Sequence, residues 1–530
     1  MIKTDIKLPL EYSVEVVAAR IAERLPVRVD ELRSITVIKK TLNVGDKTDI
    51  HYDATVAFEI SAEREAGLLK MKKKVSAYSA PTLEIREWSG GCRPVVIGAG
   101  PAGLFCALTL AQAGARPILY ERGLGVEERR KSVDRFERFG ILDPESNVQF
   151  GEGGAGAYSD GKLKVGGMDK YKYKVLSELV SHGAREDILY TVGAHIGTDK
   201  LGGIVRSIRE KIISLGGEVH FSSKLTALKV RGGRIVGGRI ASGGMTFDFE
   251  AETVVIATGH SARDTFELLR DAGALLQPRG FGIGLRLEHP REYINKLVYG
   301  ERAPAALGTA SYHLVTHLTG GRSVYSFCMC PGGTVVAAAS EQGGIVTNGM
   351  SEYSRGAENS NAAFLVSVTP DDFGSEDIFA GLELQRRIER RAFAVAGGDY
   401  RAPADSLESF MTDSAPRIAS VAPSYPRGVI PLSAKEYLPD FITDSLRAAV
   451  PDFDAWMPGF YYPDAVMTGP ETRTTSPIRV LRGEDLCAVG IDGLYPIGEG
   501  AGYAGGIVSS ARDGVMCAEE ILKKNEKATR

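Results

Sequence analysis

The sequence predicts an α/β fold of several domains, and three observations predict it. The chain has 530 residues, whereas a single hydrophobic core rarely grows beyond about 250–300 residues. A strand, a glycine turn, a helix and a second strand follow one another from Arg93 to Glu121, which is the order of a βαβ unit and so of a parallel sheet. A similar strand, glycine loop and helix close the chain from Leu494 onward. We therefore expect a parallel sheet that is assembled from distant parts of the sequence.

Residues 1–90 are expected to form a small N-terminal α/β domain. Strand-like alternation marks Lys3–Leu8, Ile35–Lys40 and Ile50–Ile60. Helical spacing marks Ser13–Leu25, with Ser13 as the N-cap, and Ala62–Met71. A basic run is either a solvated face or a local contact for nucleic acid; it consists of Lys70, Lys72, Lys73 and Lys74.

Composition excludes several classes of protein. The 64 basic residues nearly balance the 67 acidic ones, for a net charge of −3, which leaves no global case for nucleic-acid binding. No apolar run reaches the ~18 residues that span a bilayer, and the start of the chain lacks a signal-peptide pattern. Six cysteines in so long a chain do not form a disulfide framework. We expect a cytoplasmic protein with no membrane partner.

The strongest motif is Gly98-Ala99-Gly100-Pro101-Ala102-Gly103, which joins the strand Arg93–Ile97 to the helix Ala102–Ala113. In this GxGxxG pattern Gly98 allows the tight turn, Gly100 lets a diphosphate approach the backbone, and Gly103 packs the helix against the strand. The helix N-terminus adds free N–H groups and a partial positive charge. The motif predicts a Rossmann-like dinucleotide site; the alternative is a purely structural glycine turn.

An acid ends the second strand of this unit, Arg116–Glu121, and Arg122 follows it. A carboxylate at Glu121 can accept hydrogen bonds from the adenosine-ribose hydroxyls and disfavours a 2′-phosphate. The site is therefore expected to take FAD or NAD rather than NADP.

The far end of the chain distinguishes FAD from NAD. In a flavoprotein a late acid binds the ribityl chain, and the next helix directs its N-terminus at the flavin pyrimidine edge. The predicted contacts are Gly498, Glu499, Gly500, Gly505, Gly506 and Ile507. The turn Ala257-Thr258-Gly259 offers backbone contacts to the same cofactor. An ordinary βα loop is the alternative for the late segment.

With these three segments the chain resembles the glutathione-reductase-like superfamily of FAD enzymes, and within it the NAD(FAD)-utilizing dehydrogenases, which are FAD-dependent and carry a small N-terminal α/β domain. The resemblance covers essentially the whole chain. Its most specific segments are Asn147–Leu163, Phe327–Gly333, Thr347–Met350 and Glu471–Pro477. It implies bound FAD, with Gly98, Gly100, Gly103, Glu121 and Glu499 at matching positions. Glu499 stands where much of the superfamily has aspartate.

The loop Gly151–Gly161 holds too many glycines to be explained by packing. Its backbone N–H groups can line a pyrophosphate or a flavin face. The predicted contacts are Gly151, Gly153, Gly154, Ser159, Asp160 and Lys162. A surface loop with fortuitous glycines is the alternative.

Three residues are candidates for catalysis. Cys328 and Cys330 could place redox-active thiols beside a flavin, or could be two small core residues on one face of a strand. His260 could protonate a substrate or balance a flavin charge, or could belong only to a capping loop. No metal site is expected, because the sequence lacks CxxC pairs at metal-binding spacing.

A polar segment precedes the last strand and contains Glu471, Arg473, Ser476 and Arg479. An arginine at this place suits a carboxylate or a phosphate of the substrate. A salt bridge between domains would use the same residues.

The sequence thus predicts an FAD-dependent oxidoreductase in which flavin N5 accepts hydride from a small-molecule substrate or donates hydride to it. The expected domains are 1–90, an FAD-binding domain split into 93–275 and 475–530, and an inserted mixed α+β substrate domain at 276–474. The sequence has no second GxGxxG at a strand–helix junction, so NAD(P)H as electron donor would dock transiently. Two alternatives remain open: an FAD-dependent reductase or monooxygenase that acts on RNA bases through the N-terminal domain, and a flavin-binding sensor or scaffold that does not turn over.

Overall fold

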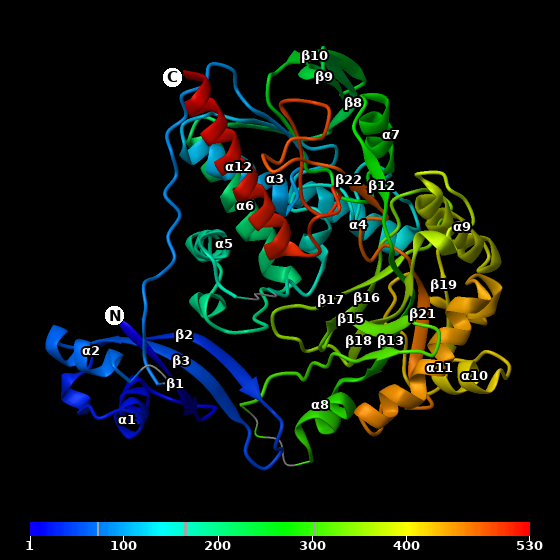
Figure 1. The fold of residues 1–530 in the computed structure, drawn as a ribbon. Coiled ribbons are helices and arrows are strands. Elements are labelled where there is room, and N and C mark those ends of the chain that lie inside the picture. The colour runs from blue at the N-terminus through cyan, green and yellow to red at the C-terminus, as the bar shows by residue number, and fades with distance from the viewer. Residues whose placement is uncertain (72–73, 164–166, 302–303, 305, 530) are drawn as a thin grey trace.

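The computed structural model describes residues 1–71, 74–163, 167–301, 304 and 306–529. Its N-terminal unit lies at one side of the molecule (Figure 1) and is a four-stranded antiparallel sheet of order β2-β3-β1-β4 with two helices. The elements are β1 (Ile2–Leu8), α1 (Val14–Arg24), β2 (Arg33–Asn43), β3 (His51–Glu59), α2 (Ala62–Leu69) and β4 (Ser76–Ala77). The strands and helices predicted here are present, although the Ser13 side chain makes no capping hydrogen bond. Of the basic run, Lys72 and Lys73 lie outside the described residues.

Five short parallel strands form the central sheet, in the order β23-β11-β5-β6-β7. They are β5 (Val95–Ile97), β6 (Ile118–Tyr120), β7 (Glu218–His220), β11 (Val254–Ile256) and β23 (Leu494–Pro496). Because successive side chains on a strand point to opposite faces, Val96 and Val255 enter one core, whereas Val95 and Val254 enter another. The prediction of a parallel sheet assembled from distant segments is confirmed.

Different layers cover the two faces of this sheet (Figure 1). On one face pack α3 (Pro101–Gln112), α5 (Lys170–Ser181), α6 (Thr198–Ser214) and α12 (Ile507–Thr529). On the other lies an antiparallel meander of β8 (Ser223–Arg231), β9 (Arg234–Ser242) and β10 (Met245–Glu250). Its strands are joined by Gly232-Gly233 and Gly243-Gly244, all with positive φ, which is the backbone that two-residue hairpin turns require. Two further helices, α4 (Val126–Phe139) and α7 (Arg263–Asp271), follow β6 and β11.

The middle of the chain forms a seven-stranded sheet of order β14-β15-β18-β13-β21-β19-β20. Its strands are β13 (Phe281–Pro290), β14 (Val315–His317), β15 (Ser323–Cys330), β18 (Asn359–Val368), β19 (Ala402–Ser406), β20 (Val429–Pro431) and β21 (Val466–Glu471). The helices around it are α8 (Arg291–Tyr299), α9 (Ala380–Val395), α10 (Leu407–Thr412) and α11 (Asp440–Trp456). Two short pairs complete the unit: β16 (Thr334–Ala337) with β17 (Thr347–Met350), and β12 (Leu276–Pro278) with β22 (Ile478–Val480).

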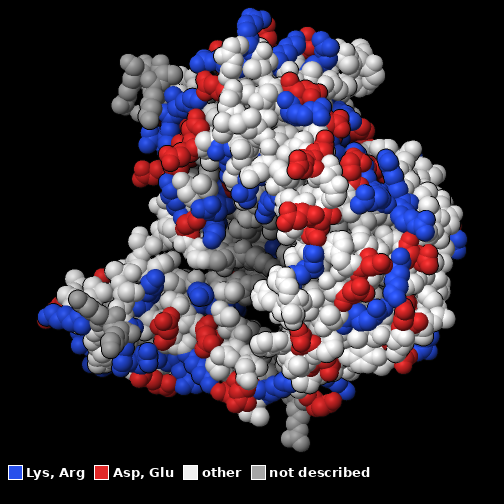
Figure 2. All heavy atoms as spheres, turned by 45° about the vertical axis from the view of Figure 1, so that its right-hand side comes forward, with Lys and Arg blue, Asp and Glu red and all other residues white. Residues whose placement is uncertain are grey.

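The N-terminal unit is joined to the rest of the chain through backbone hydrogen bonds as well as packing. The Lys40 N–H donates to the carbonyl of Tyr190 at 2.7 Å, and the Val192 N–H donates to the carbonyl of Lys40 at 2.9 Å. On the face drawn in Figure 2, basic and acidic side chains are intermingled around a hollow near its middle. In the part of the chain that the structure describes, no helix has the length and apolar character to cross a membrane.

Candidate cofactor-binding site

Four strands of the parallel sheet end at one edge, and each is followed by residues that the sequence singles out. Gly98 follows β5, Glu121 follows β6, Ala257 follows β11, and Gly498 comes two residues after β23. β5 lies between β6 on one side and β11 on the other, so the loops that leave this edge diverge there and open a crevice, as at the switch point of other open parallel sheets. A cavity lies at this edge.

The cavity brings together most of the residues predicted to contact a cofactor. Those that line it are Gly98, Gly100, Pro101, Ala102, Glu121, Arg122, Gly151, Gly154, Ser159, Asp160, Lys162, Ala257, Thr258, Gly259, Gly498, Glu499, Gly505, Gly506 and Ile507. Of the proposed catalytic residues, His260 and Cys328 line it too. Gly103, Gly153, Gly500 and Cys330 are not among the lining residues.

Three glycines act by letting segments of backbone approach one another. A Cβ on Gly98, whose φ is +103°, would lie 2.5 Å from the carbonyl oxygen of Ala257. A Cβ on Gly103 would lie 1.9 Å from the carbonyl oxygen of Gly98, and one on Gly500 would lie 2.6 Å from that of Gly259. Any larger residue would therefore push these turns apart, and Gly103 packs α3 against the turn as its sequence position predicts.

The Glu121 carboxylate joins three loops at one end of the cavity. It accepts N–H hydrogen bonds from Ala99 at 2.7 Å, Gly123 at 2.9 Å and Gly151 at 3.0 Å. A carboxylate has about four lone-pair positions, so these bonds leave one for a ligand. Glu121 is thus both a part of the cavity wall and the group that holds the glycine turn of residues 98–103 beside the loop of residues 151–161.

A fully buried arginine, which the sequence did not single out, shapes the same loop. Arg129 on α4 donates to the carbonyl oxygens of Asn147, Val148 and Glu152 at 2.9, 2.9 and 2.7 Å. Burial lowers the pKa of Arg129, but its guanidinium donates to these main-chain acceptors. In sequence it is one of several charged residues of an amphipathic helix, and only the fold turns it inward.

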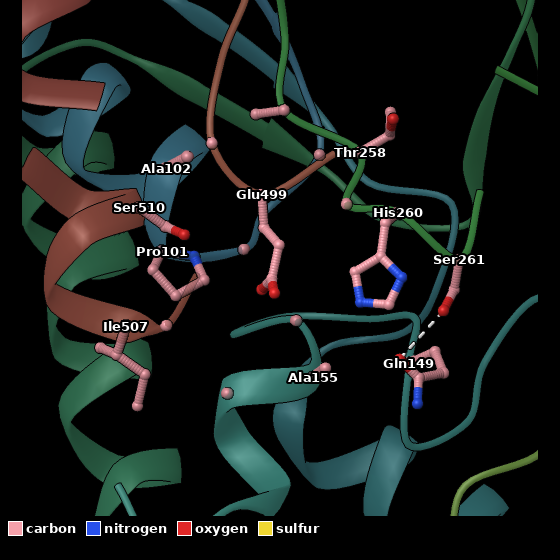
Figure 3. Close-up of a pocket in the computed structure, with 18 of the residues that line it drawn as sticks. Pro101, Ala102, Gln149, Ala155, Thr258, His260, Ser261, Glu499, Ile507 and Ser510 are labelled. Atoms are coloured by element: carbon pink, nitrogen blue, oxygen red, sulfur yellow. Dashed lines mark hydrogen bonds between the residues drawn. The ribbon is translucent and has the colours of Figure 1, made fainter. Parts of the chain in front are cut away.

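Glu499 follows β23, which β11 and β5 separate from β6 and Glu121. The side chains of Glu499 and His260 point into the cavity (Figure 3). Burial and the nearby Cys328 together raise the pKa of Glu499 to about 7, although Arg279 opposes the shift. Burial and the charges of Arg473 and Arg263 lower the pKa of His260 to about 3. In the FAD-free cavity the imidazole is therefore neutral at physiological pH and can act as a hydrogen-bonding group.

Cys328 and Cys330 do not share one face of a regular strand. The pairing of β15 with β18 shifts between Phe327 and Cys330, and Cys328 has a φ of +41°. This bulge turns Cys328 toward the cavity, whereas Cys330 is buried and its Sγ donates to the Cys328 carbonyl at 3.3 Å. Interaction with the Cys330 side chain and the charge of Arg286 lower the pKa of the Cys328 thiol, while the pKa of Cys330 is raised. Cys328 therefore ionises more readily than an ordinary cysteine.

The polar residues of the glycine-rich loop fix it to the seven-stranded part of the protein. Asp160 forms a bidentate pair with Arg355 at 3.0 and 2.6 Å, and Lys162 Nζ donates to the Met329 carbonyl at 2.8 Å. Ser159 Oγ donates to the carbonyl of Gly156, three residues earlier in the same loop. Arg122, also at the cavity wall, pairs with Asp264 at 2.7 Å. These four residues thus have structural partners in addition to their place at the wall.

Buried ion pairs occupy most of the polar segment before the last strand. Arg473 pairs with Glu389 on α9 at 2.8 Å, and Glu471 forms a bidentate pair with Arg286 on β13 at 2.7 and 2.6 Å. Ser476 Oγ donates to the carbonyl of Ile478 at 2.7 Å. Salt bridging between segments, one of the two interpretations of Arg473, is what the structure contains. Arg479 differs and makes no such pair within the described residues.

Several lining residues were not predicted from the sequence. They are Ile97, Tyr120, Gln149, Phe150, Ala155, Gly156, Ser223, Leu225, Ser261, Thr265, Phe327, Asn348, Thr474, Ile497, Val508, Ser509 and Ser510, with Glu471 and Arg473 from the polar segment. Gln149 accepts a hydrogen bond from Ser261 at 3.1 Å (Figure 3). Gln149, Phe327, Asn348 and Thr474 lie inside the segments on which the family resemblance depends, which was the available signal. Among the described residues, no group of three or more metal-ligating side chains is gathered in one place.

Comparison with known proteins gives the family. Residues 280–474 match the family described as FAD-dependent protein, C-terminal domain-like, and residues 93–274 match pyridine nucleotide-disulphide oxidoreductase. An uncharacterized protein of Clostridium beijerinckii is 41% identical over 528 residues, which cover 98% of each chain. The chain belongs to this family of FAD-dependent proteins. By family it is an FAD-dependent oxidoreductase with FAD as cofactor.

Two solved structures are similar to this FAD-dependent protein at low sequence identity. The flavin-dependent brominase Bmp2 is 12% identical, with a TM-score of 0.39, over 82% of this chain and 79% of that one. A flavocytochrome c3 fumarate reductase in an open conformation is 13% identical, with a TM-score of 0.36, over 87% and 81% of the two chains.

The cavity of this FAD-dependent protein fits the cofactor. A Cβ on Gly259, Gly505 or Gly506 would meet no atom within 4 Å, so bare backbone forms the wall and a flat ring system can approach it closely. α3 and α12 begin at the cavity without an acid in the first turn, and their N-terminal N–H groups suit a diphosphate and an electron-rich ring edge. Glu121 and Glu499 stand at its two ends as acceptors for ribose and ribityl hydroxyls.

Proposed function

We propose that the protein oxidises or reduces a small-molecule substrate by hydride transfer through FAD, and that NAD(P)H docks transiently when it is the electron donor. The observation that carries the proposal is that Glu499, His260 and Cys328 line the same cavity as Glu121, whose carboxylate holds the glycine turns together. Bound FAD supplies an acceptor or donor of hydride at the flavin ring.

The residues expected to hold FAD divide between the two ends of the cavity. Glu121 accepts hydrogen bonds from the adenosine ribose, and the α3 N-terminus, beginning at Pro101, faces the diphosphate. Glu499 accepts from the ribityl chain, and the α12 N-terminus, beginning at Ile507, provides positive charge at the pyrimidine edge. The support for this assignment is the position of all four at the wall of one cavity.

The protein's own titratable groups define what it can do to a substrate. Glu499, whose pKa is raised to about 7 in the FAD-free cavity, chiefly by burial, can be protonated near neutral pH and can then donate as well as accept a hydrogen bond. His260 stays neutral, because its pKa is lowered to about 3, and can donate or accept a hydrogen bond. The Cys328 thiol, with its lowered pKa, supplies a base or a nucleophile at the same end.

Anaerobic stopped-flow mixing tests the proposal. The FAD-loaded protein is mixed with NADH or NADPH, and the long-wavelength flavin absorption is followed. We expect at least one of the two to bleach the band in a saturable way, and an added acceptor to restore it. A flavin that neither nucleotide bleaches, and that no acceptor reoxidises after photoreduction, would favour a sensor or scaffold and contradict the proposal.

A further inference from the structure

A second cavity adjoins the first beside the start of α12. The two share four wall residues: Phe327, Thr474, Gly505 and Ser509. The other walls of the second cavity are Arg279, Tyr325, Thr475, Arg479, Gly502, Tyr503 and Ala504. The charges of Arg279 and Glu499 influence each other, so the second cavity lies next to the Glu499 end of the first. A molecule bound there would reach the flavin end of the FAD cavity.

Two arginines of this second cavity form no ion pair with a carboxylate of the described chain. Neither Arg279 nor Arg479 has an Asp or Glu oxygen within 4.0 Å among the described residues. Two arginines nearby in the sequence are different, since Arg473 pairs with Glu389 at 2.8 Å and Arg482 pairs with Asp513 at 2.7 Å. The unpaired guanidinium groups also repel each other: burial and the charge of Arg479 lower the pKa of Arg279.

Most of the hydrogen-bonding capacity of the two side chains is unused. A guanidinium has five N–H donors. Arg279 donates one hydrogen bond to Thr475 Oγ1 at 3.2 Å, and Arg479 donates one to the carbonyl of Gly502 at 3.3 Å. The Nε atom of Arg479 is buried without a partner. Because a buried donor without an acceptor is costly, these side chains are suited to an oxyanion.

The remaining walls agree with an organic anion. Among the residues that the structure describes, no Asp or Glu lines the second cavity, and α12 begins beside it without an acid in its first turn. The start of this helix adds partial positive charge. Burial raises the pKa of Tyr325, so its hydroxyl remains a donor. Phe327, Tyr503 and Ala504 supply apolar surface, which an inorganic ion would not need.

We propose that the second cavity is the substrate-binding site and that the substrate is a small organic acid whose carboxylate is bound by Arg279 and Arg479. The planar forks of two guanidinium groups match the geometry of a carboxylate. The reacting part of the substrate then lies at the shared wall of Phe327 and Thr474. The inference rests on the proposed function, since only an oxidoreductase needs a substrate beside the flavin.

Titration of the FAD-loaded protein tests this assignment at constant ionic strength. The probes are acetate, succinate and benzoate, with the corresponding neutral amides and inorganic phosphate. The flavin absorbance and the melting temperature are both recorded, and FAD content is measured first. We expect at least one carboxylate to give a saturable change in both signals, its amide to give none, and phosphate to bind more weakly. No saturable response to any carboxylate, or tighter binding of phosphate, would overturn the assignment.

Variants locate the binding. Arg279→Gln and Arg479→Gln should each weaken carboxylate binding by at least about tenfold, and Arg479→Lys should weaken it less than Arg479→Gln, because the charge remains. Arg270→Gln is the matched control, since Arg270 is exposed on α7 and pairs with Asp271. Unchanged binding in both Gln variants would refute the inference. FAD-bound protein without an anion response would refute the inference but not the proposed function. An anion-dependent melting shift in protein that cannot hold FAD would refute the proposed function, and with it the role of the second cavity as a substrate site.

Discussion

Substitution of Glu121 by glutamine removes a charge and one acceptor while keeping the size of the side chain. The carboxylate accepts three backbone N–H bonds, from Ala99, Gly123 and Gly151. Glutamine has one acceptor oxygen and two N–H donors, so at least one buried N–H group must face another donor. An unsatisfied buried donor costs about 1–3 kcal/mol, and the contact to the adenosine ribose is lost in addition. Glu121→Gln should therefore weaken FAD binding by about 10–100-fold.

The assay is reconstitution of the deflavinated protein with FAD, followed by flavin fluorescence, together with the FAD content of the protein as purified. Glu127→Gln serves as the control, because Glu127 is an exposed residue of α4 whose side chain contacts Arg206. Full FAD occupancy and unchanged affinity in Glu121→Gln, equal to those of the control, would refute the role assigned to this carboxylate.

Three further experiments have definite expected outcomes. In the FAD-free protein the pKa of Glu499 is raised from 4.5 to about 7, chiefly by burial, so the carboxyl group stays protonated in the folded state over a pH range in which it ionises in the unfolded state. The free energy of unfolding therefore falls as the pH rises from about 4.5 to about 7, by at most about 3 kcal/mol. Glu499→Gln should melt at a higher temperature than the wild type at pH 8 but not at pH 4.5, and an equal difference at both pH values would contradict this. Gly103→Ala places a Cβ 1.9 Å from the Gly98 carbonyl oxygen and should abolish FAD retention. The control is Gly202→Ala on α6, whose Cβ meets no atom within 4 Å; it should retain FAD and gain up to about 1 kcal/mol of stability. Equal FAD content in the two variants would show the packing argument to be wrong. In the FAD-free protein, iodoacetamide should label Cys328 at pH values too low for labelling of the exposed Cys92, as mapped by mass spectrometry. Labelling of Cys328 only at pH values above those needed for Cys92 would contradict the lowered pKa of Cys328.

The parts of the site that local backbone geometry dictates could be predicted from the sequence. The turn at Gly98 needs a positive φ, and the close contact at Gly103 leaves no room for a Cβ, so glycine is required at both positions and can be recognised in the sequence. The strands before Glu121 and Glu499 are apolar and short, and parallel pairing brings their ends to one edge. The fold of the FAD-binding sheet follows from these marks.

Other parts of the site depend on tertiary pairing that leaves no local mark. The sequence singles out Arg473 in the polar segment before the last strand, but it does not show that its partner is Glu389, on a helix of the middle segment. The bulge at Cys328 arises in the pairing of β15 with β18. Regular strand alternation, which would put both cysteines on one face, was therefore wrong here. No sequence pattern singles out Arg279, because only the pairing of β12 with β22 brings it beside Arg479.

A crystal structure of the purified protein tests the central claim most directly. The account predicts a single FAD molecule along the carboxyl edge of the parallel sheet, with its adenosine beside Glu121 and its isoalloxazine ring beside Glu499 and His260. Density for a different molecule in that crevice, or FAD bound in the reverse direction, would contradict it.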